Sequence, residues 1–429
     1  MKTFIFGGLA LLVFIGVPLS FALGIIATGG FLVLQKFPLL LVAQRLFTGI
    51  DVFAFMAIPF FILAGNLMTR SKITEGLVNF CNDLVGHMKA GLAHVNVLNS
   101  MFFAGISGSA AADVAGLGGI EIDMMEEGGY DRPFASAVTA ASSVVGPIIP
   151  PSIVMVIYAI TAGNVSVASL FLGGFIPGLL LCLSMMIVNY LVARRRHYPV
   201  SGRRSTLKEV AVSFIRSLPA LLMPLIILGG IISGIFTATE ASAIAVAYAL
   251  VVGLAFFRTL KWSDLPEIFL ETARTTGSVY LLIAAASVLT WLLTTQQIPQ
   301  QIADLFIQHA ANKYVFLLST NIILLIAGCL LDLTPAMLIL VPILSPVATS
   351  FGIHPLHFGL VVVVNLCIGL ITPPIGTCLF LTCNVGRIRM SELLKELWPY
   401  LVAEVSVLFL ITYVPEIVLF VPRLFGYLN

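Results

Sequence analysis

Two stretches of this chain repeat the same pattern of glycine and proline inside apolar sequence. The first runs from AGISGS (104–109) to GPIIPPS (146–152), and the second from AGCLLD (327–332) to GLITPPI (369–375). One constant offset maps Gly105 to Gly328, Ser109 to Asp332, Gly146 to Gly369 and Pro150-Pro151 to Pro373-Pro374. An interrupted helix inside a bilayer needs protein or water around its unpaired backbone groups, and paired interruptions in two halves of a chain are typical of a transporter's binding site.

The composition predicts a polytopic membrane protein that is entirely α-helical. The chain is 59% hydrophobic and 10% charged, whereas soluble chains carry about 25% charged residues. One crossing takes roughly 20 apolar residues. The segment 214–257 contains only two charged residues, Arg216 and Glu240, and is long enough for two crossings. Further apolar runs lie at 3–35, 51–69, 93–120, 134–160, 166–193, 277–295, 314–352, 355–385 and 394–426. We expect about ten to twelve membrane segments, some of them re-entrant, with 3–35 as an uncleaved first segment.

Positive charge is concentrated in one loop. Six basic residues lie between Arg194 and Lys208, and such a cluster in a short loop indicates a cytoplasmic location. A patch that binds lipid headgroups would lie on the same side. The loop 194–213 divides the chain into a first repeat, 1–193, and a second repeat, 214–429. Basic stripes with interleaved aromatic residues are absent, so nucleic acid is not an expected partner.

The two halves contain similar segments in the same order. Each has an amphipathic stretch (73–88 and 297–310), either a loop helix or an arm that braces a moving part. Next comes an apolar run that is broken at a small or polar site (93–120 and 314–352), and then a long apolar run that is broken at a Gly…Pro-Pro pattern. We predict two inverted repeats, although inversion requires an odd number of crossings per half, which hydropathy leaves open.

The first break combines small residues with prolines. Glycines in the segment 105–110 allow the backbone to leave helical geometry, and Pro147, Pro150 and Pro151 leave carbonyl groups without partners. Carbonyl and hydroxyl oxygens suit a hard cation such as Na⁺. The alternative is that these residues only kink helices or allow close helix packing.

Acidic residues within apolar sequence are also candidates, because burying a charge in a membrane is costly. Asp332 lies at the second break and could compensate a cation. Glu240 reads as a helix start that is capped by Thr237. Asp113 could cap or ligate, and the acids in 119–132 are interpreted as a solvated loop or a docking surface.

A different class of function has one sequence signature. Gly105-Ile106-Ser107-Gly108 matches the GxSG pattern of intramembrane serine proteases, with His354 or His357 as a candidate base. A protease would not explain the second copy of the pattern. The chain also lacks a P-loop, so its own ATP hydrolysis does not drive transport.

Three segments resemble the large membrane subunit of TRAP (tripartite ATP-independent periplasmic) transporters. They are SGSAAADVAGLGGIEIDMMEEGGYDRPFASAVTAASSVVGPIIPPSI (107–153), GIFTATEASAIAVAYAL (234–250) and GLITPPIGTCLF (369–380). The resemblance covers essentially the whole chain. It implies an elevator-type secondary transporter, not an enzyme, in the bacterial inner membrane, where Na⁺ entry drives uptake of sialic acid or a C4-dicarboxylate. It also implies re-entrant hairpins at about 93–120 and 314–352 and unwound helices at 134–160 and 355–385.

The resemblance also implies partners and site residues. The partners are a small four-helix membrane subunit, absent from this chain, and a soluble periplasmic substrate-binding protein. Two or more sodium sites are expected. The implied sodium ligands are Ser107, Gly108, Ser142, Val144, Gly146 and Pro147 at one site and Asp332, Thr334, Cys367, Gly369 and Thr372 at the other.

The substrate carboxylate should contact hydroxyl groups and the positive ends of helices at the breaks. The candidate residues are Ser107, Gly108, Ser109, Ser143, Thr334, Pro335 and Thr377. A stand-alone Na⁺/carboxylate symporter that needs no binding protein is the alternative within transport. Overall similarity favours sialic acid over a dicarboxylate as the substrate.

Overall fold

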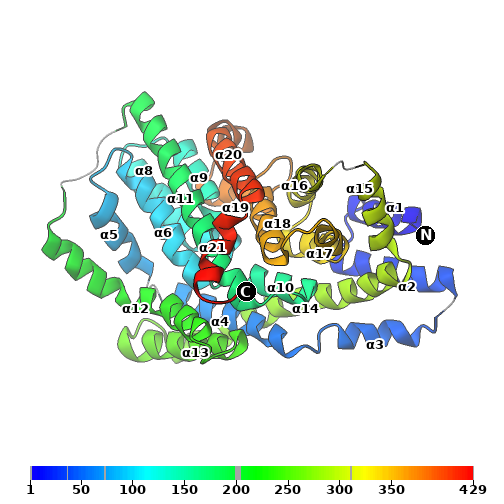
Figure 1. Cartoon of the computed structure of the whole chain (residues 1–429). Coiled ribbons are helices and arrows are strands. Elements are labelled where there is room, and N and C mark those ends of the chain that lie inside the picture. The colour runs from blue at the N-terminus through cyan, green and yellow to red at the C-terminus, as the bar shows by residue number, and fades with distance from the viewer. Residues whose placement is uncertain (1, 36, 72–73, 199–203, 310–311, 429) are drawn as a thin grey trace.

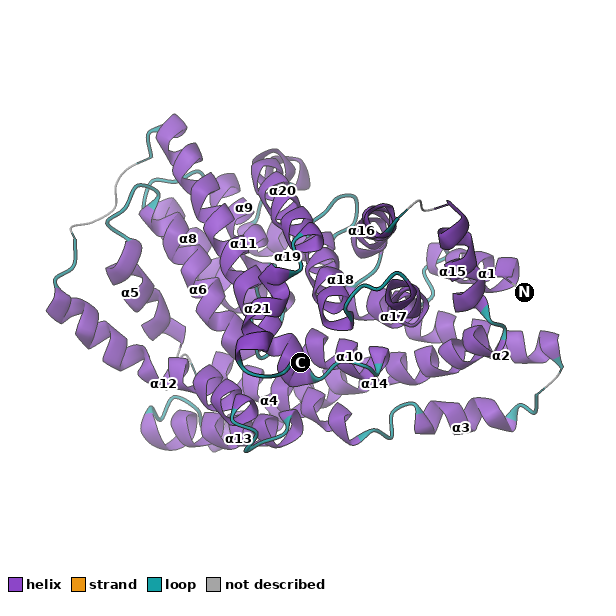
Figure 2. Cartoon of the chain, in the orientation of Figure 1, coloured by secondary structure: helices purple, strands orange, loops and turns teal. Residues whose placement is uncertain are grey.

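The computed structural model describes the chain except for residues 1, 36, 72–73, 199–203, 310–311 and 429. Within the described residues every regular element is helical, as predicted (Figure 2). The first half contains α1 (Lys2–Phe14), α2 (Leu19–Leu34), α3 (Leu40–Thr48), the 3₁₀ turn η1 (Phe53–Met56), α4 (Ala57–Arg70), α5 (Thr74–Val85), α6 (Gly91–Ser107), α7 (Ala110–Asp113), the π-helical turn η2 (Val114–Gly118), α8 (Gly119–Glu127), α9 (Arg132–Ser143), α10 (Ile153–Ala162) and α11 (Val167–Arg196).

The second half has a similar number of elements. It contains α12 (Leu207–Ile232), α13 (Ala238–Val251), the π-helical turn η3 (Val252–Phe256), the 3₁₀ turn η4 (Trp262–Asp264), α14 (Leu265–Thr295), α15 (Ile298–His309), α16 (Lys313–Leu330), α17 (Leu333–Ser350), α18 (Pro355–Gly369), α19 (Thr377–Gly386), α20 (Met390–Tyr413) and α21 (Glu416–Leu424). Both amphipathic stretches of the sequence are therefore helical, as α5 and α15.

Fewer helices than expected are long enough to cross a bilayer. Among the described residues seven qualify, or up to eight if α20 and α21, which are bent by 63° at their junction, form one span. The expected ten to twelve differs because several apolar runs are divided into shorter helices, among them α10, α18 and α19. Large apolar side chains such as Leu183, Ile187 and Ile215 are exposed on α11 and α12, as expected for surfaces that face lipid.

The apolar run at 3–35 is two helices and not the single membrane segment that we expected. Gly16 has a φ of +88°, which favours glycine, and Pro18 precedes the first residue of α2. These two residues end α1 and start α2, which pack against each other.

The helices form two sets that contact each other (Figure 1). In one set, α2, α3 and α4 pack along α14, α13 packs on α4, and α12 packs on α13. In the other set, α6 and α20 contact α9, α11 contacts α20 and α21, and α16 and α17 contact α18. The sets meet where α4 contacts α6 and α10, and where α14 contacts α17. The apolar core is continuous across both sets.

The predicted linker 194–213 is helical at both ends. Helix α11 continues to Arg196, and α12 begins after a capping box formed by Thr206 and Glu209. Residues 199–203 of the linker lie outside the described residues. The basic residues Arg194–Arg196 thus form the end of a membrane-length helix.

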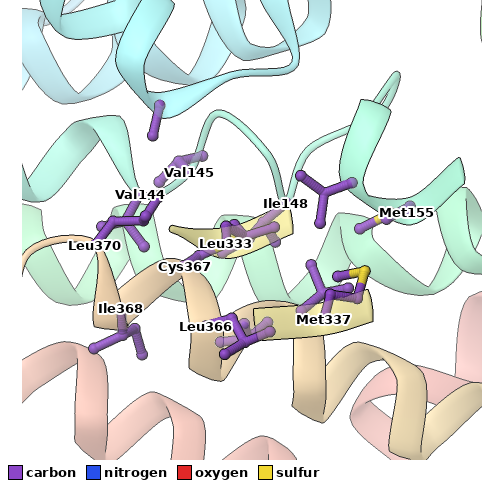
Figure 3. Packing of buried hydrophobic residues seen from close by; sticks show 14 of the residues in the cluster. Val144, Val145, Ile148, Met155, Leu333, Met337, Leu366, Cys367, Ile368 and Leu370 are labelled. Carbon is purple, nitrogen blue, oxygen red and sulfur yellow. The ribbon is translucent and has the colours of Figure 1, made fainter. Parts of the chain in front are cut away.

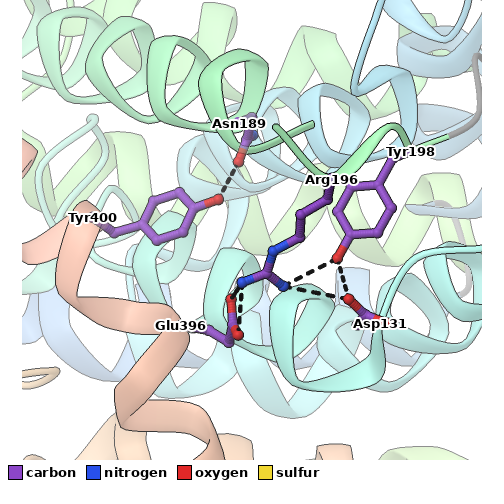
Figure 4. A network of polar contacts seen from close by, with 6 residues as sticks. All are labelled: Asp131, Asn189, Arg196, Tyr198, Glu396 and Tyr400. Carbon is purple, nitrogen blue, oxygen red and sulfur yellow. Dashed lines mark hydrogen bonds and ion pairs between the residues drawn. The ribbon is translucent and has the colours of Figure 1, made fainter. Parts of the chain in front are cut away.

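Arg196 joins three helices at this end of the molecule (Figure 4). Its guanidinium donates to both carboxylate oxygens of Glu396 on α20, at 2.6 and 2.9 Å, and to Asp131 before α9 at 3.3 Å. The Tyr198 hydroxyl donates to Asp131. Nearby, the Tyr400 hydroxyl on α20 donates to Asn189 on α11. These contacts fix the start of α9, whose other end forms part of the candidate site.

Candidate functional site

The predicted first break lies between α6 and α7. Gly108, which follows α6, has a φ of +59°, and a Cβ there would lie 2.7 Å from the carbonyl oxygen of Pro151. Only glycine satisfies both requirements. Ser109 then caps α7 by accepting a hydrogen bond from the Ala112 N–H at 3.4 Å. The returning chain continues through η2 and α8 to Glu127, beyond the predicted end at 120.

The break between α9 and α10 lies directly against this one. A Cβ on Gly146 would lie 3.0 Å from the backbone carbon of Ser109. The Pro147 carbonyl accepts a hydrogen bond from the Ser152 hydroxyl, which also caps α10. Prolines at 147 and 150 have no N–H, and no group in the described part of the chain donates to the carbonyls of Val144 or Gly146. These two oxygens are therefore available to a cation.

The second pair of breaks also meets through backbone. A Cβ on Gly369, at the end of α18, would lie 2.6 Å from the Cα of Gly328 on α16. Between α18 and α19, the Gly376 N–H donates to the carbonyl of Cys329 at 3.3 Å. The Pro150-Pro151 and Pro373-Pro374 peptide bonds are both cis.

Several oxygens gather around the second break. The carbonyl oxygens of Leu370 and Thr372 lie 2.6 and 3.0 Å from the position of a Cβ on Gly376. The Thr377 hydroxyl donates to Asp332 at 3.3 Å, and both residues are exposed. The Thr372 hydroxyl donates to the Ile368 carbonyl at 2.8 Å. The Leu370 carbonyl also accepts a hydrogen bond from the Cys378 N–H at 3.1 Å. The polar groups named at this break are all oxygens, the ligand type that a hard cation prefers.

The two pairs of breaks pack together through apolar side chains (Figure 3). Val144, Val145 and Ile148 of the first break lie beside Leu333 of α17 and beside Leu366, Cys367, Ile368 and Leu370 at and just after the end of α18. The predicted site residues are mostly buried here. The buried ones are Ser107, Gly108, Ser142, Ser143, Val144, Gly146, Pro147, Pro335, Cys367 and Gly369, whereas Ser109, Thr334 and Thr372 are half-buried. The two pairs of breaks thus lie near each other, with packed apolar side chains between them.

Two buried acids form part of a polar cluster that the sequence interpretation missed. The acids in 119–132 were expected in a solvated loop. Residues 119–127 are instead helix α8, and although Asp123, Glu126 and Glu127 are exposed as expected, Glu121 is only 1% exposed. Glu121 accepts a hydrogen bond from Asn99 of α6 at 2.6 Å. Asp113, also 1% exposed, accepts one from Ser100 at 2.7 Å. Among the described residues no Lys or Arg pairs with either acid.

The same cluster includes the predicted ligand Ser142. Its hydroxyl donates to Asn96 of α6 at 2.8 Å and lies 3.0 Å from the hydroxyl of Ser100. Asn96 and Ser100 are four residues apart, so they share one face of α6. That spacing was the signal in the sequence. At the position equivalent to Ser142 in the second half, Asn365 of α18 donates to Asn321 of α16 at 2.9 Å.

The remaining candidates have structural roles. Glu240 and Thr237 form the predicted capping box at the start of α13. His354 caps α18, and His357 lies 3.0 Å from the Ile411 carbonyl, at the opposite end of α18 from Gly369. The Ser107 hydroxyl accepts from the Ser109 N–H at 3.5 Å. No serine–histidine pair forms in the described part of the chain, so the geometry gives no support to a protease.

The fold and the paired breaks define a class of multi-pass membrane transport protein. A crystal structure of the YdaH transporter of Alcanivorax borkumensis has the same fold, with a TM-score of 0.63 at 13% sequence identity, over 87% of this chain and 88% of that one. Residues 6–417 match the family described as the DctM component of tripartite ATP-independent periplasmic transporters. The chain belongs to this family, and it is a bacterial membrane permease and not an enzyme.

Two relatives illustrate the family. The chain is 41% identical to the sialic acid TRAP transporter large permease protein SiaM of Vibrio cholerae, over 99% of both chains. It is also 41% identical to the C4-dicarboxylate TRAP transporter large permease protein DctM of Pseudomonas aeruginosa, over 90% of both chains. Equal identity to permeases for two different acids establishes the class of transporter without selecting one substrate.

Proposed function

We propose that this chain carries an organic carboxylic acid into the cell together with Na⁺, by an elevator movement of two inverted repeats. The observation that carries the proposal is the contact between matched breaks: Gly146 lies against Ser109, and Gly369 lies against Gly328. In each half an interrupted helix is thus held against a helix break or helix end. Interruptions of this kind supply backbone groups for ions and substrates in secondary transporters.

The proposed sodium ligands differ between the two sites. At the first site, the free carbonyls of Val144 and Gly146 would bind Na⁺ beside Ser107 and Ser142. At the second, Asp332 would supply charge to the oxygens of Thr334, Gly369 and Thr372. Bound Na⁺ would hold together carbonyl oxygens that otherwise repel one another, and would thereby order the chain around the substrate.

The substrate is proposed to be held through its carboxylate. The Ser109 hydroxyl and the helix starts at α7 and α17 present hydrogen-bond donors. The hydroxyls of Ser143 and Thr377, which donate to the Ala140 carbonyl and to Asp332 in this structure, would turn to the substrate when it binds. Such donors recognise a carboxylate but not the rest of the molecule. Sialic acid and C4-dicarboxylates are both candidates, because each is the named substrate of a relative with the same identity.

A soluble periplasmic binding protein and a small membrane subunit are the proposed partners, which accords with the tripartite character of the family. Closure of the site before movement would be required, since each polar group that is exposed to lipid without a partner costs several kcal/mol. A stand-alone symporter would show the same dependence on Na⁺ but no dependence on a binding protein.

The test is uptake into proteoliposomes that contain this chain and its small subunit. Radiolabelled N-acetylneuraminate and succinate would be supplied with and without an inward Na⁺ gradient, and with and without the cognate binding protein. We expect uptake of one acid that needs both the gradient and the protein. Uptake without the binding protein would favour the stand-alone symporter, and no Na⁺-dependent uptake of either acid would refute the proposal.

A further inference from the structure

One cavity in the described part of the chain lies away from both breaks. It has a volume of about 380 Å³ and is bordered by α3, the C-terminal part of α14, the end of α10, and α17. Ligand-binding cavities commonly have volumes of this order. Its walls belong to different sets of helices: α3 and α14 on one side, and α10 and α17, which begin at the breaks, on the other (Figure 1).

Arg45 is the only Lys or Arg among the residues that line this cavity, and no Asp or Glu lines it. The arginine is exposed and forms no ion pair with any described residue; nearby Asp51 does not line the cavity. A guanidinium in a membrane protein without an acidic partner favours an anion, because its charge is otherwise uncompensated.

The position of Arg45 is set by Trp291. The guanidinium carbon lies 5.5 Å from the centre of the indole ring, and that ring stacks on Phe31 with centroids 5.2 Å apart. The Arg45 side chain donates no hydrogen bond within the described residues, so its N–H groups stay free to donate. The arginine is therefore held in place without using the donors that would bind a carboxylate.

Two hydroxyl groups add to this donor set. Ser287 and Thr290 lie one turn apart on α14, both line the cavity and both are half-buried. Neither hydroxyl donates a hydrogen bond within the described residues, unlike the Thr161 hydroxyl, which donates to Ile157. One charged fork and two neutral hydroxyls match a carboxylate, which only accepts hydrogen bonds.

The direction of the helices places the cavity on the periplasmic side. The basic end of α11 is cytoplasmic by the positive-inside rule, and α12, α13 and α14 follow as consecutive membrane-length helices. Helix α14 therefore starts at the cytoplasm and ends outside, and Ser287 and Thr290 are in its outer half. On α10, Thr161 lies about 13 Å along the helix from Ser152 at the break.

We propose that this cavity, which we call the Arg45 cavity, is a second carboxylate-binding site, where the substrate acid is held by Arg45, Ser287 and Thr290 before it reaches the breaks. This role rests on the proposed function of organic-acid uptake. Because α10 and α17 form part of its wall, movement of the helices at the breaks would change its shape and release the acid.

Tryptophan fluorescence tests the binding directly. The chain has three tryptophans, so a variant with Trp262→Phe and Trp398→Phe leaves Trp291 as the only reporter, next to Arg45. Purified protein in phosphatidylcholine nanodiscs would be titrated with N-acetylneuraminate and with succinate. We expect a saturable change with at least one of them. Arg45→Gln should weaken it at least about tenfold, and Arg45→Lys and Thr290→Val less. Arg274→Gln, an exposed charge at the other end of α14, is the matched control.

Three further outcomes separate the possibilities. If phosphatidylglycerol, and neither acid, changes the Trp291 signal, the cavity binds a lipid headgroup and the proposal is wrong. If the wild type shows Na⁺-driven uptake while Arg45→Gln, Arg45→Lys and Thr290→Val all have the wild-type KM and signal, this inference fails and the proposed function stands. If the wild type shows no Na⁺-driven uptake, the proposed function fails independently.

Discussion

The two pairs of breaks share a backbone arrangement but place their acidic groups differently. In the first half, the acids lie behind the break: Asp113 and Glu121 are buried and held by side chains of α6. In the second half, Asp332 is at the tip of the hairpin, exposed, and bonded to Thr377. The position equivalent to Asp332 is occupied in the first half by the uncharged Ser109.

The comparison distinguishes residues that are the same in both halves from residues that differ between them. Glycine is retained at 146 and 369, because a Cβ at either position would press on the neighbouring backbone. Polar side chains at equivalent positions differ between the halves, for example Ser142 in the first and Asn365 in the second. We infer that backbone oxygens are the common part of both proposed ion sites, and that side chains set their differences.

The largest expected effect on stability and uptake comes from adding a side chain at Gly369, where the backbone of α18 touches that of α16. In Gly369→Val, the new side chain would overlap the Cα of Gly328, 2.6 Å from its Cβ, and backbone cannot move aside cheaply. We expect a loss of about 1–3 kcal/mol or more of stability and no uptake. Thermal unfolding in detergent and proteoliposome uptake measure both. Gly277→Ala, where no atom lies within 4 Å, should be harmless; equal tolerance of both would contradict the backbone account.

The acid at the tip of the second hairpin should matter for transport and not for folding. Asp332 is exposed, so Asp332→Ala should leave the unfolding temperature unchanged. It removes the only charge proposed for the second ion site, and Na⁺-driven uptake should fall to background. Asp304→Ala, at an exposed acid on α15, serves as the control. Normal uptake by folded Asp332→Ala would exclude this residue as an ion ligand.

A smaller loss of stability is expected from breaking the side-chain hydrogen bonds between α6 and α9 in the first half and between α16 and α18 in the second. Ser142→Ala removes the donor to Asn96 and leaves that buried amide oxygen unsatisfied, and Asn365→Ala does the same to Asn321. Each should cost about 1–3 kcal/mol. Ser406→Ala, at an exposed serine on α20, should change the unfolding temperature little. If only one of the two buried substitutions destabilises the protein, the halves do not use equivalent contacts.

The smallest expected effect on stability comes from Tyr198, which lies outside both breaks and donates a hydrogen bond to Asp131 at the start of α9. Burial, followed by the hydrogen bond to Asp131, raises the pKa of Tyr198 from 10.0 to about 12. A raised pKa means that the neutral phenol stabilises the folded state below about pH 10, and that this contribution is lost as the pH rises to 12. Tyr198→Phe should remove this dependence and cost less than about 1 kcal/mol. Unfolding temperatures between pH 8 and 11 would reveal it, and identical profiles would contradict the assignment.

Much of the helical layout could be predicted, because it depends on local chemistry. Glycine, proline and the capping residues Thr237 and Glu240 act within a few residues of their own position, so both breaks and the start of α13 were found. The turn at Gly16 was missed: Gly16 and Pro18 are the local signals that divide the run, but they lie in apolar sequence that is long enough for one membrane crossing. The predicted loop at 119–132 was wrong because Glu121 finds its partner, Asn99, on another helix.

The sequence by itself determined where this chain breaks its helices, and that it belongs in a membrane, because both follow from local backbone preferences and from apolar composition. Only the tertiary structure decided which breaks lie against each other, which acids are buried, and that Arg45 borders a cavity with Ser287 and Thr290. Those facts depend on contacts between residues far apart in the chain, and the free energy of such contacts is not encoded at any single position.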